Sequence, residues 1–182
     1  LVINSYKNPL NTFKTNIIGT ANLLESVKNI DCIKSVVIIT TDKVYKNKKK
    51  ETFFSEEDEL GGVDPYSASK AAADYAVQSY INNGLSSKKN LKIAIARAGN
   101  VIGGGDWSFS RIIPDCVRSW SKNKPVKIRN PNSTRPWQHV LDVLYGYIIL
   151  AVILKKNKKV NGEAFNFGPR IEKKREVINV VK

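Results

Sequence analysis

Two side chains with the types and spacing of a proton-transfer pair occur at Tyr66 and Lys70. Residues four apart lie on one face of a helix, so the phenol and the ammonium would be neighbours. A cation beside a phenol favours the phenolate and lowers the phenol pKa from its usual value near 10. We therefore expect this pair to act as a general base near neutral pH.

Spacing alone is weak evidence for such a base, because Tyr45 and Lys49 repeat it. Tyr45 precedes a run of lysines without apolar periodicity, which predicts a loop. Tyr66 instead follows an Asp-Pro pair, a favoured helix start, and precedes an alanine-rich stretch of strong helix formers. Only Tyr66 and Lys70 are therefore expected on a helix.

A hydroxyl, a carboxylate and an amine follow one another at Thr41, Asp42 and Lys43. The residues before them are short, apolar and β-branched, which indicates a buried strand of a parallel sheet. Ligands bind such sheets at the carboxyl ends of the strands. These three side chains are therefore candidates to complete an active site with Tyr66.

The periodicity of apolar residues and the turn signals between them predict alternating helices and strands. Helices are expected over residues 11–29, 65–83, 110–122 and 140–155, with another beginning near 175. Strands are expected over 35–41, 91–96, 126–128 and 164–167. This order predicts an α/β fold in which helices cover a parallel sheet.

Composition is that of one globular domain: 182 residues, of which 42% are hydrophobic. No apolar stretch is long enough to cross a membrane, and no leader peptide is visible. A net charge of +14 is typical of proteins that bind nucleic acid. No aromatic residues interleave with the lysine runs, however, so we interpret these lysines as solvated surface residues. Cys32 and Cys116 lack metal-ligand spacing and predict free thiols in the cytoplasm.

Five segments can be compared as a set: Thr15 to Thr20, Thr40 to Tyr45, Pro65 to Lys70, Arg97 to Val101 and Arg135 to Val140. In order and spacing they resemble the extended short-chain dehydrogenase/reductase family. The Thr-Asp pair is similar to that of nucleotide-sugar 4,6-dehydratases. The glycine-rich loop from Gly99 to Trp107 and the Arg-Pro-Trp-Gln-His stretch resemble the branch that acts on CDP-glucose.

The resemblance implies the later half of a Rossmann-type doubly wound parallel sheet with part of a small substrate-binding lobe. Residues 1–102 and 137–168 would form the NAD-binding part, and residues 103–136 and 169–182 the lobe. It implies cofactor contacts by Asn16, Tyr66, Lys70, Asn100 and Val101, and contacts to the nucleotide diphosphate by Asn100, Arg111, Arg135 and Asn166. His139, the single histidine, is expected to pack near the sugar nucleotide rather than to catalyse.

The implied reaction removes water from the sugar of CDP-glucose. Tyr66 would take the proton of the 4-hydroxyl, Thr41 would hydrogen-bond the same hydroxyl, and Lys70 would hold the cofactor's ribose. Asp42 would protonate the departing 6-hydroxyl, which requires a raised pKa and partial burial. Lys43 would remove the carbon-5 proton or stabilise the enolate, whereas the dTDP-glucose enzymes carry Glu at this position.

One family feature is missing from the chain, the glycine-rich dinucleotide turn. Gly103-Gly104-Gly105 follows a late strand and lacks the required spacing. The chain is therefore expected to be an internal fragment of a longer protein. An epimerase or dTDP-glucose dehydratase of the same family remains an alternative, as does a non-catalytic dimerising fragment.

The family also implies an assembly and a metabolic role. Helices 11–29 and 65–83 would pair with their copies in a homodimer, with Ala71, Ala72 and Ala76 permitting close approach. The product would enter deoxysugar biosynthesis, as for lipopolysaccharide O-antigen.

Overall fold

The computed structural model of the chain describes residues 2–46, 53–85, 91–170 and 176–182. Lys49, the second residue of the alternative Tyr-Lys spacing, lies outside these residues. Cα packing divides the chain into two compact units. The first comprises Leu1–Ala98 and Tyr145–Phe167, and the second comprises Gly99–Leu144 and Gly168–Lys182.

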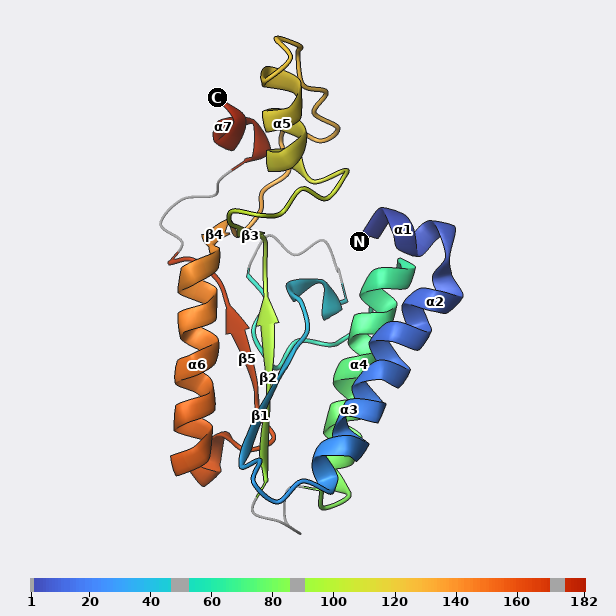
Figure 1. Cartoon of the computed structure of the whole chain (residues 1–182), viewed down its shortest axis with the longest axis vertical. Helices are drawn as coiled ribbons and strands as arrows, with labels where there is room; N and C mark the ends of the chain where they lie inside the picture. Colours follow the sequence, from blue (N-terminus) through green and yellow to red (C-terminus); the bar gives the residue numbers. More distant parts are fainter. Residues whose placement is uncertain (1, 47–52, 86–90, 171–175) are drawn as a thin grey trace. The chain divides into compact units, whose positions relative to one another are not determined.

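A parallel sheet of three strands, counted over the described residues, forms the centre of the first unit (Figure 1). Its strands are β1 (Ser35–Ile39), β2 (Lys92–Ala98) and β5 (Ala164–Phe167), in the order β1-β2-β5. The predicted parallel α/β sheet is confirmed. Because all three strands run the same way, their carboxyl ends lie at one edge of the sheet.

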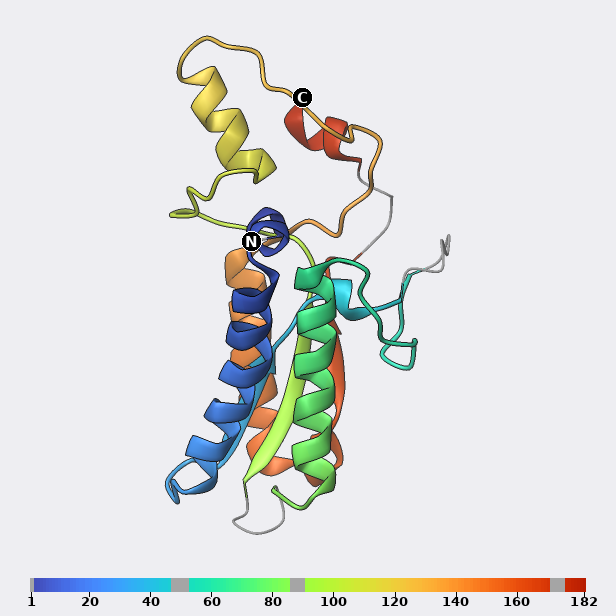
Figure 2. The same cartoon turned by 90° about the vertical axis from the view of Figure 1, so that its right-hand side faces the viewer.

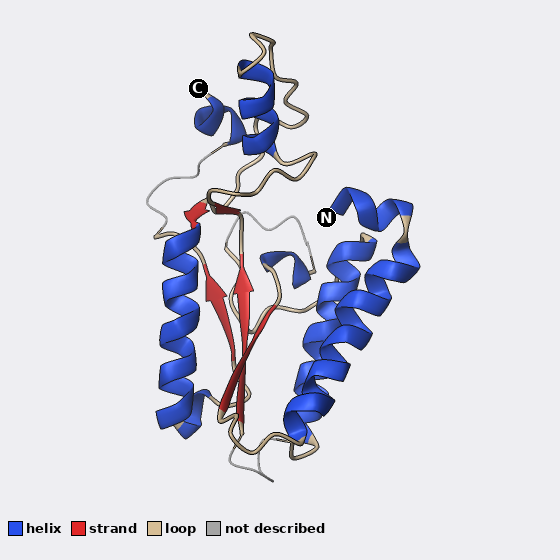
Figure 3. Ribbon diagram, in the orientation of Figure 1, coloured by secondary structure: helices blue, strands red, loops and turns tan. Residues whose placement is uncertain are grey.

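Helices cover both faces of this sheet (Figure 3). One face carries α3 (Gly19–Lys28) and α4 (Pro65–Asn82), and the other carries the Tyr145–Lys156 part of α6 (Val140–Lys156). The buried helix side chains that pack on the strands include Leu24, Val27, Val77, Leu150 and Leu154. Burial of these apolar surfaces holds the carboxyl ends of the strands in place.

The helix predicted over residues 11–29 consists of three successive segments that follow α1 (Val2–Lys7). These are α2 (Pro9–Phe13), the π-helical η1 (Lys14–Ile18) and α3. A π-helical turn has one more residue than an α-helical turn and often occurs at functional sites. Figure 2 shows α3 running alongside α4, so residues of this turn face the first turns of α4.

Asp64 fixes the start of α4, as the sequence predicts. Its Oδ1 accepts hydrogen bonds from the backbone N–H groups of Tyr66 and Ser67, both at 3.0 Å, and its Oδ2 accepts one from Ser67 Oγ at 2.6 Å. Burial alone would raise the pKa of Asp64, but the hydrogen bonds from Ser67 and Tyr66 outweigh it and lower that pKa. Gly84, at a φ of 80°, follows the helix end, where a left-handed residue is favoured.

The second unit contains α5 (Ile112–Trp120), α7 (Val177–Val181) and two short parallel strands. These are β3 (Val101–Ile102) and β4 (Gln138–His139). The sequence did not predict β3 or β4, because two residues are too few to show a period. The strand predicted over residues 126–128 is wrong, since that segment has no regular structure.

Cys32 and Cys116 are free thiols, as the sequence predicts. Among the described residues, no helix has the length and apolar content needed to span a membrane.

Candidate active site

The turn after β1 runs from Thr41 to Val44. Its last three residues form the 3-10 helix η2 (Asp42–Val44). Thr41 is only 7% exposed. Its Oγ1 donates to Asp42 Oδ1 at 3.0 Å and accepts from the backbone N–H of Lys43 at 3.4 Å. Asp42 is half-buried, whereas Lys43 is exposed.

Tyr66 and Lys70 lie on the first turns of α4, four residues apart as the sequence predicts. Lys70 Nζ donates to the backbone O of Ile39 at 3.2 Å, which places this ammonium at the carboxyl end of β1. Burial lowers the pKa of Lys70 from its usual value. The pair and the turn after β1 therefore belong to one edge of the sheet.

Asn16, in the π-helical turn, is joined to the same part of α4. Its Nδ2 donates to Ser69 Oγ at 2.8 Å, and Ser69 Oγ donates to the backbone O of Tyr66 at 2.7 Å. A side-chain amide is thus held beside the Tyr-Lys pair. The structure brings together Asn16, Tyr66 and Lys70, three residues expected to contact a cofactor.

Asn166, at the carboxyl end of β5, is held by three hydrogen bonds. Its Oδ1 accepts from Tyr45 Oη at 2.6 Å, and its Nδ2 donates to the backbone O of Phe54 at 3.1 Å. Its backbone N–H donates to Glu56 Oε1 at 2.7 Å. The side chain is therefore fixed at the sheet edge that carries Thr41.

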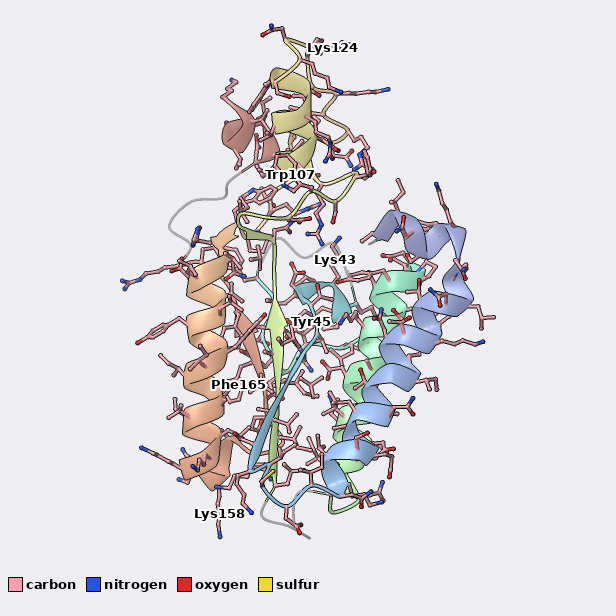
Figure 4. All side chains as sticks on the ribbon, in the orientation of Figure 1. Lys43, Tyr45, Trp107, Lys124, Lys158 and Phe165 are labelled. Carbon is pink, nitrogen blue, oxygen red and sulfur yellow. The ribbon has the colours of Figure 1, made fainter. Side chains whose placement is uncertain are left out.

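Tyr45 is the residue whose importance the sequence underestimates. It is 4% exposed, and its ring stacks on Phe54 with centroids 4.9 Å apart (labelled in Figure 4 with Lys43 of the same turn). Burial raises the pKa of its phenol, although the hydrogen bond from Arg97 acts in the opposite direction. Tyr45 is thus a buried anchor of the turn, whereas the sequence placed it in a solvated loop.

Arg97 and Asp74 form a buried ion pair that sequence reasoning also missed. The two side chains are 3% and 0% exposed. Arg97 Nε and Nη2 donate to the two carboxylate oxygens of Asp74 at 2.9 and 3.0 Å. One signal was available, since a charge inside an apolar strand needs a buried partner.

The remaining candidate residues belong to the second unit. The backbone O of Asn100 accepts from Gln138 N at 3.0 Å, and Val101 pairs with Gln138 in the short sheet. Arg111 Nε lies 3.2 Å from Asp106 Oδ2. Exposed Arg135 donates through Nη1 to the backbone O of Thr134 at 2.7 Å.

His139 lies in β4, and its side chain is exposed. Its Nδ1 accepts a hydrogen bond from the backbone N–H of Leu141 at 3.2 Å. Its side chain therefore accepts a backbone N–H from the first turn of α6. The expectation that it packs near the sugar nucleotide stays a prediction.

No group of three or more potential metal-ligating His, Cys, Asp or Glu side chains occurs in the part of the chain that the structure describes. The polar groups at the sheet edge of the first unit are instead a phenol, a hydroxyl, a carboxylate, an amide and an ammonium. That set can move protons and bind sugar hydroxyls.

Comparison with known proteins agrees with this chemistry. The chain is 45% identical over 185 residues to CDP-glucose 4,6-dehydratase of Salmonella typhimurium, with all of this chain and 52% of that protein covered. It is 31% identical to dTDP-D-glucose 4,6-dehydratase of Dictyostelium discoideum, with 94% of this chain and 39% of that protein covered. The chain thus spans about half the length of the curated relatives it matches, or less.

Solved structures show the same fold. The dTDP-glucose 4,6-dehydratase of Bacillus anthracis in complex with NAD aligns with a TM-score of 0.76 at 30% identity, covering 93% of this chain and 50% of that one. The sequence pattern described as the NAD dependent epimerase/dehydratase family matches residues 2–168. The chain has the Rossmann-type fold of these enzymes, and it belongs to the NAD dependent epimerase/dehydratase family.

Proposed function

We propose that the complete protein containing this chain is a CDP-glucose 4,6-dehydratase, a hydro-lyase that uses NAD. The observation that carries the proposal is the 45% identity to the Salmonella enzyme over the whole chain. The position of the Thr41–Asp42 turn and the Tyr66–Lys70 pair at the same sheet edge supports the proposal, in which the turn would provide the acid and the pair the base.

The donors near α4 fit a nicotinamide dinucleotide. Lys70 offers an ammonium at the carboxyl end of β1, and Asn16 offers an amide beside it. Such groups suit ribose hydroxyls and a carboxamide. When bound, NAD would supply the hydride acceptor for oxidation at carbon 4, and its reduced form would be the hydride donor for carbon 6.

In this proposal Tyr66 carries out the proton transfer at oxygen 4 of the sugar. Its phenolate takes the proton of the 4-hydroxyl, and Thr41 Oγ1 hydrogen-bonds the same oxygen. Lys70 keeps the phenol acidic through its charge. The resulting 4-keto group acidifies the proton on carbon 5.

In the loss of water, Asp42 is the acid that delivers a proton to the departing 6-hydroxyl. Its half-buried position beside Thr41 supports this role. The proton on carbon 5 must pass to a base. Lys43, which is exposed in the described part of the chain, would be that base or would stabilise the enolate.

Substrate binding is proposed for four of the candidate residues. Arg111 and Arg135 would hold the nucleotide diphosphate, for which the planar guanidinium is suited. Asn100 and Asn166 would assist them, and Val101 would contact the cofactor. The first unit would then be part of the NAD-binding domain and the second part of the substrate-binding lobe, acting in the cytoplasm on deoxysugar biosynthesis such as that of O-antigen.

Two alternatives remain distinguishable from this proposal. A nucleotide-sugar epimerase would lose no hydroxyl and would need no acid such as Asp42. A non-catalytic fragment would bind no cofactor, so titration of this chain with NAD separates a remnant from an enzyme part.

The substrate test compares glucose attached to four different nucleoside diphosphates. We expect the complete protein to convert CDP-glucose with NAD to CDP-4-keto-6-deoxyglucose, with the highest kcat/KM among CDP-, dTDP-, UDP- and GDP-glucose. Chromatography and mass analysis of the products measure this. Preferred turnover of another nucleotide, or a product that keeps its 6-hydroxyl, contradicts the proposal.

We also propose that the complete protein is a homodimer through η1, α3 and α4. The exposed apolar side chains Ile18, Leu23 and Tyr75 on these helices support this surface. Ala71, expected to permit close approach, is 4% exposed and packs with Val44 and Tyr45 in the core, so that part of the expectation is wrong.

Sedimentation tests the dimer. The complete protein is expected to sediment as a dimer at micromolar concentration, and Leu23→Glu is expected to shift it toward monomer, because a charge replaces an apolar contact. Ile148→Glu, on an exposed position of α6 over the other sheet face, is the matched control and should leave the dimer intact. A monomeric wild-type protein would disprove the assembly.

A further inference from the structure

Both flanks of the turn that carries Thr41, Asp42 and Lys43 are attached to one buried ion pair. That pair is Arg97 at the carboxyl end of β2 with Asp74 in α4, bonded at both carboxylate oxygens. A bidentate ion pair of this kind fixes the relative orientation of the two side chains as well as their distance. It therefore determines where β2 and α4 stand relative to each other.

The flank before the turn is Thr40, which is 6% exposed. Its backbone N–H donates to the backbone O of Ala96 at 2.8 Å, and its Oγ1 donates to Asp74 Oδ2 at 3.4 Å. Thr40 is therefore joined both to β2 and to the carboxylate of the pair.

The flank after the turn is Tyr45. Its hydroxyl accepts from Arg97 Nη1 at 3.0 Å and donates to Asn166 Oδ1 at 2.6 Å. The Arg97 guanidinium also lies 5.1 Å from the centroid of the Tyr45 ring, and its Nη1 donates to the backbone O of Glu56 at 3.1 Å. The second flank is thus joined to the cation of the same pair.

We infer that Arg97, Asp74 and Tyr45 are positioning residues that hold the turn of Thr41–Val44 in register with α4. Asp74 lies four residues after Lys70 and eight after Tyr66 on that helix. The pair therefore couples the acid and hydroxyl of the turn to the base on the helix. The inference rests on the catalytic roles proposed above.

A purely stabilising role is the competing explanation of a buried ion pair. Such pairs are weak evidence for stability, because the cost of removing two charges from water offsets their attraction. Stability alone also gives no reason for one flank to bond the anion and the other flank the cation. Catalysis does give a reason, because a misplacement of about 1 Å can cost on the order of a hundredfold in rate.

Tyr45→Phe in the complete protein tests the inference, because it removes the hydroxyl and leaves the ring stacked on Phe54. We expect kcat for CDP-glucose to fall about tenfold or more, while KM changes by less than about twofold. Tyr147→Phe is the matched control, since it also removes a phenol hydroxyl, from a half-buried tyrosine whose ring packs edge-on against Phe167 of β5. It should leave kcat within about twofold of wild type.

Two further measurements separate positioning from general loss of structure. In an Asp42→Asn background, Tyr45→Phe should cost much less than it does alone, because both act through the same turn. Thr40→Val perturbs the opposite flank and should behave in the same way. Full additivity of Tyr45→Phe with Asp42→Asn, or a loss no larger than that of Tyr147→Phe, overturns the inference.

Amide hydrogen exchange keeps this test independent of the proposed reaction. The N–H groups of Lys43 and Val44 bond Thr41 Oγ1 and Thr41 O. We expect both amides to exchange faster in Tyr45→Phe than in wild type, and at an unchanged rate in Tyr147→Phe. If the protein does not act on CDP-glucose, the proposed function fails. The positioning role of Tyr45 is then tested by the amide hydrogen exchange alone. Unchanged exchange at Lys43 and Val44 overturns the positioning role.

Discussion

Tyr66→Phe is expected to slow oxidation of the sugar at carbon 4 by a hundredfold or more. The phenylalanine ring keeps the shape of the side chain but cannot accept the proton of the 4-hydroxyl. A positioned general base contributes about 10²–10⁴-fold in rate, so its removal should cost this much. Formation of NADH from CDP-glucose in a single turnover, followed at the nicotinamide absorbance band, measures the step.

Asp42→Asn should separate the second half-reaction from the first. The amide has the shape of the carboxyl group but cannot deliver a proton to the departing 6-hydroxyl. This variant should still form NADH in a single turnover, and the absorbance should persist because water leaves slowly. Loss of the oxidation step as complete as in Tyr66→Phe would show that Asp42 is not the leaving-group acid.

The sequence predicts the parts of this site that depend on local chemistry. Asp64 and the alanines after Tyr66 place the Tyr-Lys pair on a helix, because caps and helix propensity act over a few residues. Thr41 and Asp42 follow from the rule that ligands bind at the carboxyl ends of parallel strands. The structure confirms the sheet, the α4 cap and the position of the turn.

What the sequence misses depends on partners far along the chain. Tyr45 reads as a loop residue because lysines follow it, yet Arg97 and Asn166 hold it in the core. The π-helical turn around Asn16 has no signature in apolar periodicity. Val126 and Ile128 alternate like a strand, but their segment pairs with no strand in the described residues, so alternation alone is insufficient.

Removal of one member of the buried ion pair is the second large effect that we expect. Arg97→Met leaves the carboxylate of Asp74, which is 0% exposed, without its cation. Loss of one partner from a buried pair costs about 3–5 kcal/mol, because an uncompensated charge stays in the interior. Urea unfolding of the complete protein should show this loss in the free energy of unfolding, and Lys28→Met, at an exposed pair with Glu25, should change it by less than about 0.5 kcal/mol.

The double variant Arg97→Met, Asp74→Leu distinguishes the energetic role of the pair from its positional role. Apolar residues of similar volume can replace a buried ion pair without net loss, so much of the stability should return. The hydrogen bonds that Thr40 and Tyr45 make to the pair do not return, because methionine and leucine offer no polar partner. We therefore expect the double variant to unfold near the wild-type urea concentration while its kcat for CDP-glucose stays at least about tenfold below wild type. Recovery of both stability and kcat would mean that the pair only supports the fold. Recovery of neither would mean that the surrounding polar groups, left without partners in the core, dominate the energetics.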